Sequence, residues 1–293
     1  MSTVTRSEAG WARRPERAAR DAARSPWARR AARAGIAARG VVFLGLGYLL
    51  ARIALGALGD GGTGTSVSGQ GVASAIAAQS GGRVALGVLG VGLLLYALYS
   101  LFEAVRGPVG ERSEAKRWAL RGRSLWQAAL YGTFGVYCLA KAMSATSGSG
   151  SSAHQNRQQE QWSARVLRWP AGWLWLLLLA LVLFVLAGVQ LRNCIKQSFL
   201  EDLERGRMSA RAWTAARVLG VAGHAGRTGT FALVGWFVAQ AAFEDDPNKG
   251  RGVDGSARML ASSSGGPVLL WLLAAGLVAF GLYLFVEARY RRV

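Results

Sequence analysis

Cysteine and histidine are scarce, because this chain of 293 residues contains only two of each. Cys138 and Cys194 fall at opposite depths of the membrane helices predicted below. A disulfide needs Cα atoms within about 7 Å, so this separation excludes one. His154 and His224 are separated in the same way and cannot share a metal ion. The sequence therefore predicts neither a disulfide framework nor a metal site.

Motifs of catalysis and cofactor binding are also missing. The chain contains no HExxH or GxSxG motif. Its one glycine-rich stretch, 59–69, follows an apolar run and lacks the Lys-Ser/Thr pair that opens a helix in phosphate-binding loops. We interpret this stretch as a flexible loop. We expect no catalytic residue and no cofactor, and we do not expect an enzyme.

Acidic residues are few, since 16 Asp and Glu stand against 35 Lys and Arg, for a net charge of +19. Such a charge can indicate a nucleic-acid partner. Here, however, the basic residues alternate with long apolar runs. A membrane helix needs about 20 mostly apolar residues, and six segments approach that length: 40–59, 84–105, 125–143, 171–191, 228–243 and 267–286. The sequence predicts an all-α polytopic membrane protein with six transmembrane helices.

The basic residues also sort by loop. Most of the 35 lie in four segments: 1–39, 106–124, 192–227 and 287–293. Because Lys and Arg favour the cytoplasmic side, this alternation predicts a multi-pass protein of the cell membrane with both termini cytoplasmic. We expect anionic lipid headgroups as partners of the inner face and leave protein partners open. Nucleic acid is not an expected partner.

Two internal alignments relate the start of the chain to its end. At a spacing of 188 residues, 34–51 matches 222–239, and at 184 residues, 71–106 matches 255–290. A weaker middle copy follows at spacings of 88 and 90 residues. All three copies enter from the same side, which predicts three parallel two-helix repeats with a pseudo-threefold axis along the membrane normal. The predicted organisation is a basic disordered tail (1–24) followed by repeats at 25–106, 107–195 and 196–293. Short outer segments, interpreted as interfacial helices or loops, lie at 71–79, 161–169 and 255–263.

Small residues recur at the same place in the first and third repeats. Gly47 and Ala51 correspond to Gly235 and Ala239, each pair four residues apart. Close backbone approach through small residues drives helix association in lipid, so these four are candidates for helix contacts. The alternative is that glycine is simply common in membrane helices.

Charged residues recur at the inner helix ends. Arg39 and Glu103 of the first repeat correspond to Arg227 and Glu287 of the third. The middle repeat carries Gln127 and Asn193 there. Because both charges are lost together, we predict one pair in each repeat: the ion pairs Arg39–Glu103 and Arg227–Glu287, and the amide pair Gln127–Asn193. Separate solvation of each charge among headgroups is the alternative.

Three stretches carry a family resemblance: "SPWARRAARAGIAARGVVFLGLGYL", "GVASAIAAQSGGRVALGVLGVGLLLYALY" and "FLEDLERGRMSARAWTAARVLGVAGHAGRTGTFALVGWF". They resemble domain of unknown function family 1206, bacterial integral membrane proteins with three tandem two-helix repeats. The resemblance covers about residues 25–290 and is weakest in the middle repeat, where Gln127 replaces the arginine. It implies a fold and a location in the bacterial inner membrane, and no activity.

Two functions follow from this pattern. The first is a structural or accessory membrane protein that works through lipid or protein partners. The second is a small-solute or ion transporter or channel along the repeat axis. Transport paths usually place polar residues inside the membrane, and the predicted spans contain few of them. The sequence therefore favours the accessory function.

Overall fold

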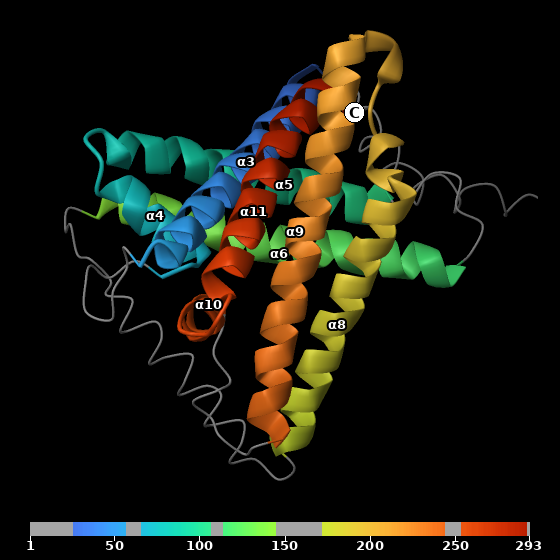
Figure 1. The fold of residues 1–293 in the computed structure, drawn as a ribbon. Coiled ribbons are helices and arrows are strands. Elements are labelled where there is room, and N and C mark those ends of the chain that lie inside the picture. The colour runs from blue at the N-terminus through green and yellow to red at the C-terminus, as the bar shows by residue number, and fades with distance from the viewer. Residues whose placement is uncertain (1–25, 57–65, 107–113, 145–171, 244–252, 292–293) are drawn as a thin grey trace, which may run out of the picture.

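The computed structural model describes residues 26–56, 66–106, 114–144, 172–243 and 253–291 (Figure 1). Within these ranges the chain forms helices and no strand, apart from one isolated β-bridge between Leu203 and Arg291. The predicted all-α fold is confirmed for this part of the chain. The predicted N-terminal tail lies outside the described residues.

Six long helices coincide with the six predicted spans. They are α3 (Pro26–Ala54), α5 (Gly82–Arg106), α6 (Glu114–Met143), α8 (Gly172–Lys196), α9 (Ala210–Phe243) and α11 (Gly266–Tyr290). Four of them, α3, α5, α8 and α11, are long and apolar enough to cross a membrane. The helices α6 and α9 are also long, but polar residues such as Arg123 and Arg227 interrupt their apolar runs. A crossing by α6 and α9 stays a prediction.

Two short helices precede the second long helix of the first and third repeats. They are α4 (Gly69–Ala77) and α10 (Val253–Ala261). Each overlaps a predicted outer segment, 71–79 or 255–263. The Ser68 hydroxyl caps α4 by accepting a hydrogen bond from the Gly71 amide. Gly81 and Gly265 then turn the chain with φ of 79° at equivalent positions, a conformation that glycine adopts without steric cost. The segment 161–169 lies outside the described residues.

Within the first and third repeats, the two long helices cross at glycine. A Cβ atom on Gly35 of α3 would lie 2.7 Å from the Tyr96 backbone of α5. At the matching place, a Cβ on Gly223 of α9 would lie 2.5 Å from the Phe280 backbone of α11. Any side chain at these glycines would therefore push the helices apart. The same crossing occurs twice because the sequence repeats it.

The middle repeat lacks this crossing. At the repeat spacing, Arg123 takes the place of Gly35 and Leu186 the place of Tyr96. Both are exposed, and α6 and α8 make no extended contact. The bulk of Arg123 explains why this helix pair stays open, since a side chain there cannot fit against a neighbouring backbone.

Between repeats, the second helix of one unit packs against the first helix of the next. The pairs are α5–α6, α8–α9 and α11–α3, so the third unit returns to the first. Each seam is centred on an equivalent glycine. A Cβ on Gly47 would lie 2.9 Å from the Ala274 carbonyl oxygen, one on Gly135 3.0 Å from that of Gly90, and one on Gly235 3.6 Å from that of Ala180. Three equivalent seams thus connect the units in a ring that is open only between α6 and α8.

The three pairs do not form a parallel bundle. Figure 1 shows α5 and α6 running across the direction of α8 and α9. The helices α3 and α11 run obliquely to both of these pairs. The two helices of the first unit, and those of the third, consequently cross, whereas α3–α11, α5–α6 and α8–α9 run alongside each other. The glycine at each crossing is therefore important.

The crossing glycines give the first prediction. Gly223→Ala should lower the free energy of unfolding by about 1–3 kcal/mol, because the new methyl group meets backbone atoms that cannot move independently. Gly188→Ala on α8 is the control, since no atom lies within 4 Å of its Cβ position. It should raise stability by up to about 1 kcal/mol through helix propensity. Reversible unfolding in mixed micelles measures both, and equal effects of the two changes would contradict the crossing.

Candidate functional site

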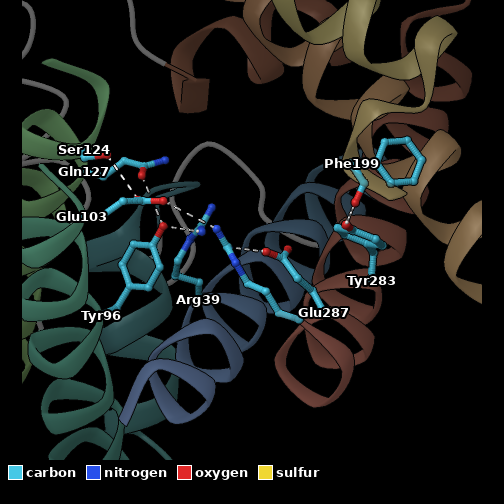
Figure 2. A network of polar contacts seen from close by, with 9 residues as sticks. Arg39, Tyr96, Glu103, Ser124, Gln127, Phe199, Tyr283 and Glu287 are labelled. Atoms are coloured by element: carbon cyan, nitrogen blue, oxygen red, sulfur yellow. Dashed lines mark hydrogen bonds and ion pairs between the residues drawn. The ribbon is translucent and has the colours of Figure 1, made fainter. Parts of the chain in front are cut away.

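Polar side chains gather around Arg39, near the middle of α3 (Figure 2). Arg39 is 6% exposed and donates a 2.6 Å hydrogen bond to the Tyr96 hydroxyl of α5. Tyr96 in turn donates to the Gln127 side-chain oxygen of α6, at 3.3 Å. The guanidinium carbon lies 4.5 Å from the Tyr96 ring centre and 5.1 Å from that of Tyr131. Two aromatic rings from adjacent repeats therefore enclose this cation.

A second cation has the same surroundings. The Arg227 guanidinium of α9 lies 4.5 Å from the Phe280 ring centre and 5.3 Å from that of Phe43. Phe280 and Phe43 correspond to Tyr96 and Tyr131 at the repeat spacings. The two rings of each set also meet edge to face, at 4.7 Å for Phe43–Phe280 and 5.1 Å for Tyr96–Tyr131. We call these two sets the aromatic boxes of Arg39 and Arg227.

Gln190 of α8 supplies the hydrogen bonds of Arg227. With its amide oxygen oriented toward the guanidinium, Gln190 accepts two hydrogen bonds, of 2.9 and 3.0 Å. Its amide nitrogen then donates to His224 Nδ1 at 3.1 Å. The His224 ring stacks on Phe199 with 4.9 Å between ring centres. Gln190 of α8 and His224 of α9 thus hold Arg227 in place, and Phe199, from the short 3-10 helix Ser198–Leu200 after α8, supports His224.

The two predicted acidic residues, both labelled in Figure 2, converge on Arg291, the residue that follows α11. Glu287 forms a buried ion pair with Arg291, and Glu103 lies 3.9 Å from the same guanidinium. Glu103 also accepts a 3.2 Å hydrogen bond from the Ser124 hydroxyl. Burial by itself would lower the pKa of Arg291, but Glu287 and its other neighbours raise that pKa above the ordinary value. Arg291 therefore stays charged and joins the third repeat to the first.

The observed partners differ from the predicted pairs. Arg39 bonds to Tyr96 rather than Glu103, and Arg227 bonds to Gln190 rather than Glu287. The reason is that neutral acceptors lie within reach of both arginines, while Arg291 takes both carboxylates. In the middle repeat, Gln127 bonds to Tyr96, and Asn193 accepts a 3.2 Å hydrogen bond from Ser198. Gln127 and Asn193 are therefore not paired either.

The four small residues lie at seams between repeats. Gly47 faces α11 and Gly235 faces α8, as described above. Ala51 packs against a core cluster that includes Leu50 of α3 and Leu270 of α11. Ala239 packs against a cluster with Leu176 and Ala180 of α8. All four therefore lie beside a helix of another unit.

Four residues of the site have no assigned role in the sequence reasoning: Tyr96, Tyr131, Gln190 and Arg291. The repeat gives a signal for the first two, because Tyr96 aligns with Phe280 and Tyr131 with Phe43. Gln190 and Arg291 carry no such signal, since the other repeats lack them. Within the described residues, no three His, Cys, Asp or Glu side chains lie close enough to hold a metal ion.

The Arg291 junction gives a second prediction. Glu287→Gln should destabilise the protein by about 3 kcal/mol, because a buried cation loses its closest carboxylate. The control is Glu204→Gln, which removes the exposed pair with Arg207 and should change stability by no more than about 1 kcal/mol. Unfolding in mixed micelles compares them. A Glu287→Gln effect as small as the control would show that the junction contributes little.

The comparisons with known proteins agree with this architecture. A family described as Domain of Unknown Function (DUF1206) matches three segments, 34–107, 124–197 and 222–291. The "Uncharacterized protein YxxB" of Bacillus subtilis (strain 168) is 28% identical over 269 residues, which cover 92% of this chain and 93% of the relative. No solved structure matches the chain. Because the matched segments cover most of the sequence and coincide with the repeats, the chain belongs to the DUF1206 family and contains three tandem copies of its unit.

Proposed function

We propose that this chain is an integral protein of the bacterial cell membrane that acts as a structural or accessory component through lipid or protein partners. The observation that carries the proposal is the surface of α8. Within its apolar segment Trp173–Lys196, the most apolar stretch of 18 residues has a mean hydropathy of 2.7, yet only 17% of that stretch is buried. So much exposed apolar surface requires lipid or a partner around it. No enzymatic activity is part of this proposal.

Exposed tryptophans support a membrane orientation of the middle repeat. Trp173 and Trp175 are exposed at the start of α8, and Trp118 and Trp126 in the first half of α6. Tryptophan favours the two membrane–water interfaces. In the proposed topology the first pair lies at the outer interface and the second at the inner one, with both termini cytoplasmic and all six long helices crossing.

Equivalent arginines support binding to anionic lipid. Arg29, Arg117 and Arg217 occupy matching positions in the first helices of the three repeats. All three are exposed. In the proposed topology they lie at the inner face, where each contributes about 1 kcal/mol to attraction for an anionic leaflet. The ring of units thereby presents one basic residue per repeat to the headgroups.

A transporter along the repeat axis is the second candidate. The observation that favours it is the equivalent position of Arg39, Gln127 and Arg227 in the first helices. Polar residues inside membrane helices often mark solute paths. The close packing around Arg39 favours the accessory function, because transport requires these side chains to separate.

Cysteine labelling tests the topology. In a Cys138→Ala, Cys194→Ala background, Arg117→Cys and Ser144→Cys mark the two ends of α6, and Arg211→Cys and Phe243→Cys those of α9. A membrane-impermeant maleimide should label Ser144→Cys and Phe243→Cys in intact cells, and the other two only in inverted vesicles. Labelling of both ends of α6, or of α9, from one side contradicts a six-helix crossing.

Lipid analysis tests the proposed partner. The triple change Arg29→Gln, Arg117→Gln, Arg217→Gln should reduce the excess of phosphatidylglycerol that co-purifies with the protein, by up to about fivefold per arginine. Arg83→Gln, at the opposite end of α5 from Glu103, is the single-charge control and should leave the excess unchanged. Mass spectrometry of lipids bound after purification gives the measurement. An unchanged excess in the triple variant removes the support for headgroup binding.

A further inference from the structure

Arg39 and Arg227 lack a carboxylate partner. Within the described part of the chain, the hydrogen bonds of Arg39 go to Tyr96 and those of Arg227 to Gln190, both neutral acceptors. The carboxylates at this end of the bundle, Glu103 and Glu287, contact Arg291 instead. No described carboxylate contacts either guanidinium directly, and Glu287 attracts both only from a longer distance, an arrangement that is costly away from water.

The two arginines also lie near each other. Phe43 follows Arg39 by one helical turn on α3, and its ring lies 5.3 Å from the Arg227 guanidinium. Phe43 also contacts Phe280, on which Arg227 stacks. Phe43 therefore lies beside Arg39 on its own helix and beside Arg227 across the helix contact, which brings two like charges to the same part of the interior, where they repel. A group that binds both cations at once relieves this repulsion.

Two buried side-chain nitrogens of this cluster have no hydrogen-bond partner among the described residues. Arg39 Nε and His224 Nε2 are buried without one. Both side chains are more than nine-tenths buried. Most buried polar groups in proteins are paired, so two unpaired nitrogens beside two uncompensated cations indicate a ligand.

From this geometry we propose that Arg39 and Arg227 together bind one phosphate group, of the phosphomonoester class, between the two aromatic boxes. The planar guanidinium matches phosphate oxygens with paired donors. A phosphomonoester carries about −1.5 to −2 charges at neutral pH and so balances two arginines. A carboxylate carries one charge and leaves one arginine uncompensated.

The open side of the ring provides access to this site. Tyr131 of α6 reaches Arg39 and Gln127 of α6 reaches its partner Tyr96, while Gln190 of α8 reaches Arg227, so both helices contribute to the site. The helices α6 and α8 make no extended contact with each other. A soluble phosphate enters from the inner end, whereas a lipid enters between α6 and α8 with its chains on the exposed apolar face of α8. Only the lipid source rests on the proposed membrane function.

Binding by the full chain in neutral detergent separates the sources. Inorganic phosphate is titrated at constant ionic strength, and phosphatidic acid is compared with phosphatidylcholine in nanodiscs, with thermal unfolding as the first readout. Binding to the native state raises Tm. A response to phosphate and phosphatidic acid indicates a headgroup-independent phosphate site, phosphatidic acid alone indicates a lipid, and phosphate alone a soluble ligand. No response to either overturns the proposal.

Matched variants locate the site. Arg39→Gln and Arg227→Gln should each weaken binding by about tenfold to hundredfold, as expected for loss of charged hydrogen bonds. The control is Arg192→Gln with Arg211→Gln, which removes two exposed arginines from α8 and α9. It should leave phosphate affinity unchanged. Equal weakening in the control and the site variants overturns the proposal in favour of diffuse attraction to the basic surface.

A third change covers the case in which the site variants fail to fold. Gln127→Arg restores the arginine that the other two repeats carry at this position and adds a third cation near Arg39. Phosphate affinity should then rise by about fivefold or more, whereas a purely structural role of the arginines predicts no gain. An unchanged affinity in a folded Gln127→Arg protein overturns the proposal, whatever the topology experiments show.

Discussion

Close approach of helix backbones at glycine is the constraint on which this fold depends. The two helices of the first unit, and those of the third, cross at a short contact, while helices of adjacent units run alongside each other (Figure 1). Gly35 and Gly223 permit the crossings within units, and Gly47, Gly135 and Gly235 permit those between units. In a lipid environment, where apolar side chains gain little from leaving the solvent, such contacts supply much of the packing free energy. The repeat survives in the sequence where this constraint is strongest.

The middle repeat shows what happens where the constraint is released. It keeps Gly135 and therefore its seam with the first repeat. It carries Arg123, however, where the other two repeats have Gly35 and Gly223. Its two helices do not pack against each other: α6 packs against α5, and α8 packs against α9. The same repeat carries Gln127 in place of arginine and Asn193 in place of glutamate. Loss of the crossing and loss of the charges thus coincide in one unit, which leaves two cations around the axis and one open side.

The sequence predicts the helices, their triplication and their small-residue contacts because each rests on a local pattern. Apolar runs of sufficient length predict helices, and recurrence at fixed spacing predicts equivalent units. The partners of Arg39 and Arg227 were not predictable in this way. Arg291 captures both glutamates from a position that the other repeats do not share, and Gln190 has no equivalent in them. The separation of α6 from α8 has a sequence signal, because Arg123 stands where the other repeats have glycine. That signal can be interpreted only once the structure shows that the helices of the other repeats cross at this position.

The electrostatics of the site follow from this departure from symmetry. If each arginine paired with the glutamate of its own unit, every repeat would be neutral at its inner end and the axis would carry no net charge. Arg291 contacts both carboxylates instead, Glu287 in a close ion pair and Glu103 at 3.9 Å. Among the described residues, the direct contacts of Arg39 and Arg227 are then with aromatic rings and neutral acceptors. Rings offset part of the cost of burying a cation and leave its charge in place. The two arginines are therefore left without a described carboxylate in direct contact because Arg291, which has no equivalent in the other repeats, holds both glutamates.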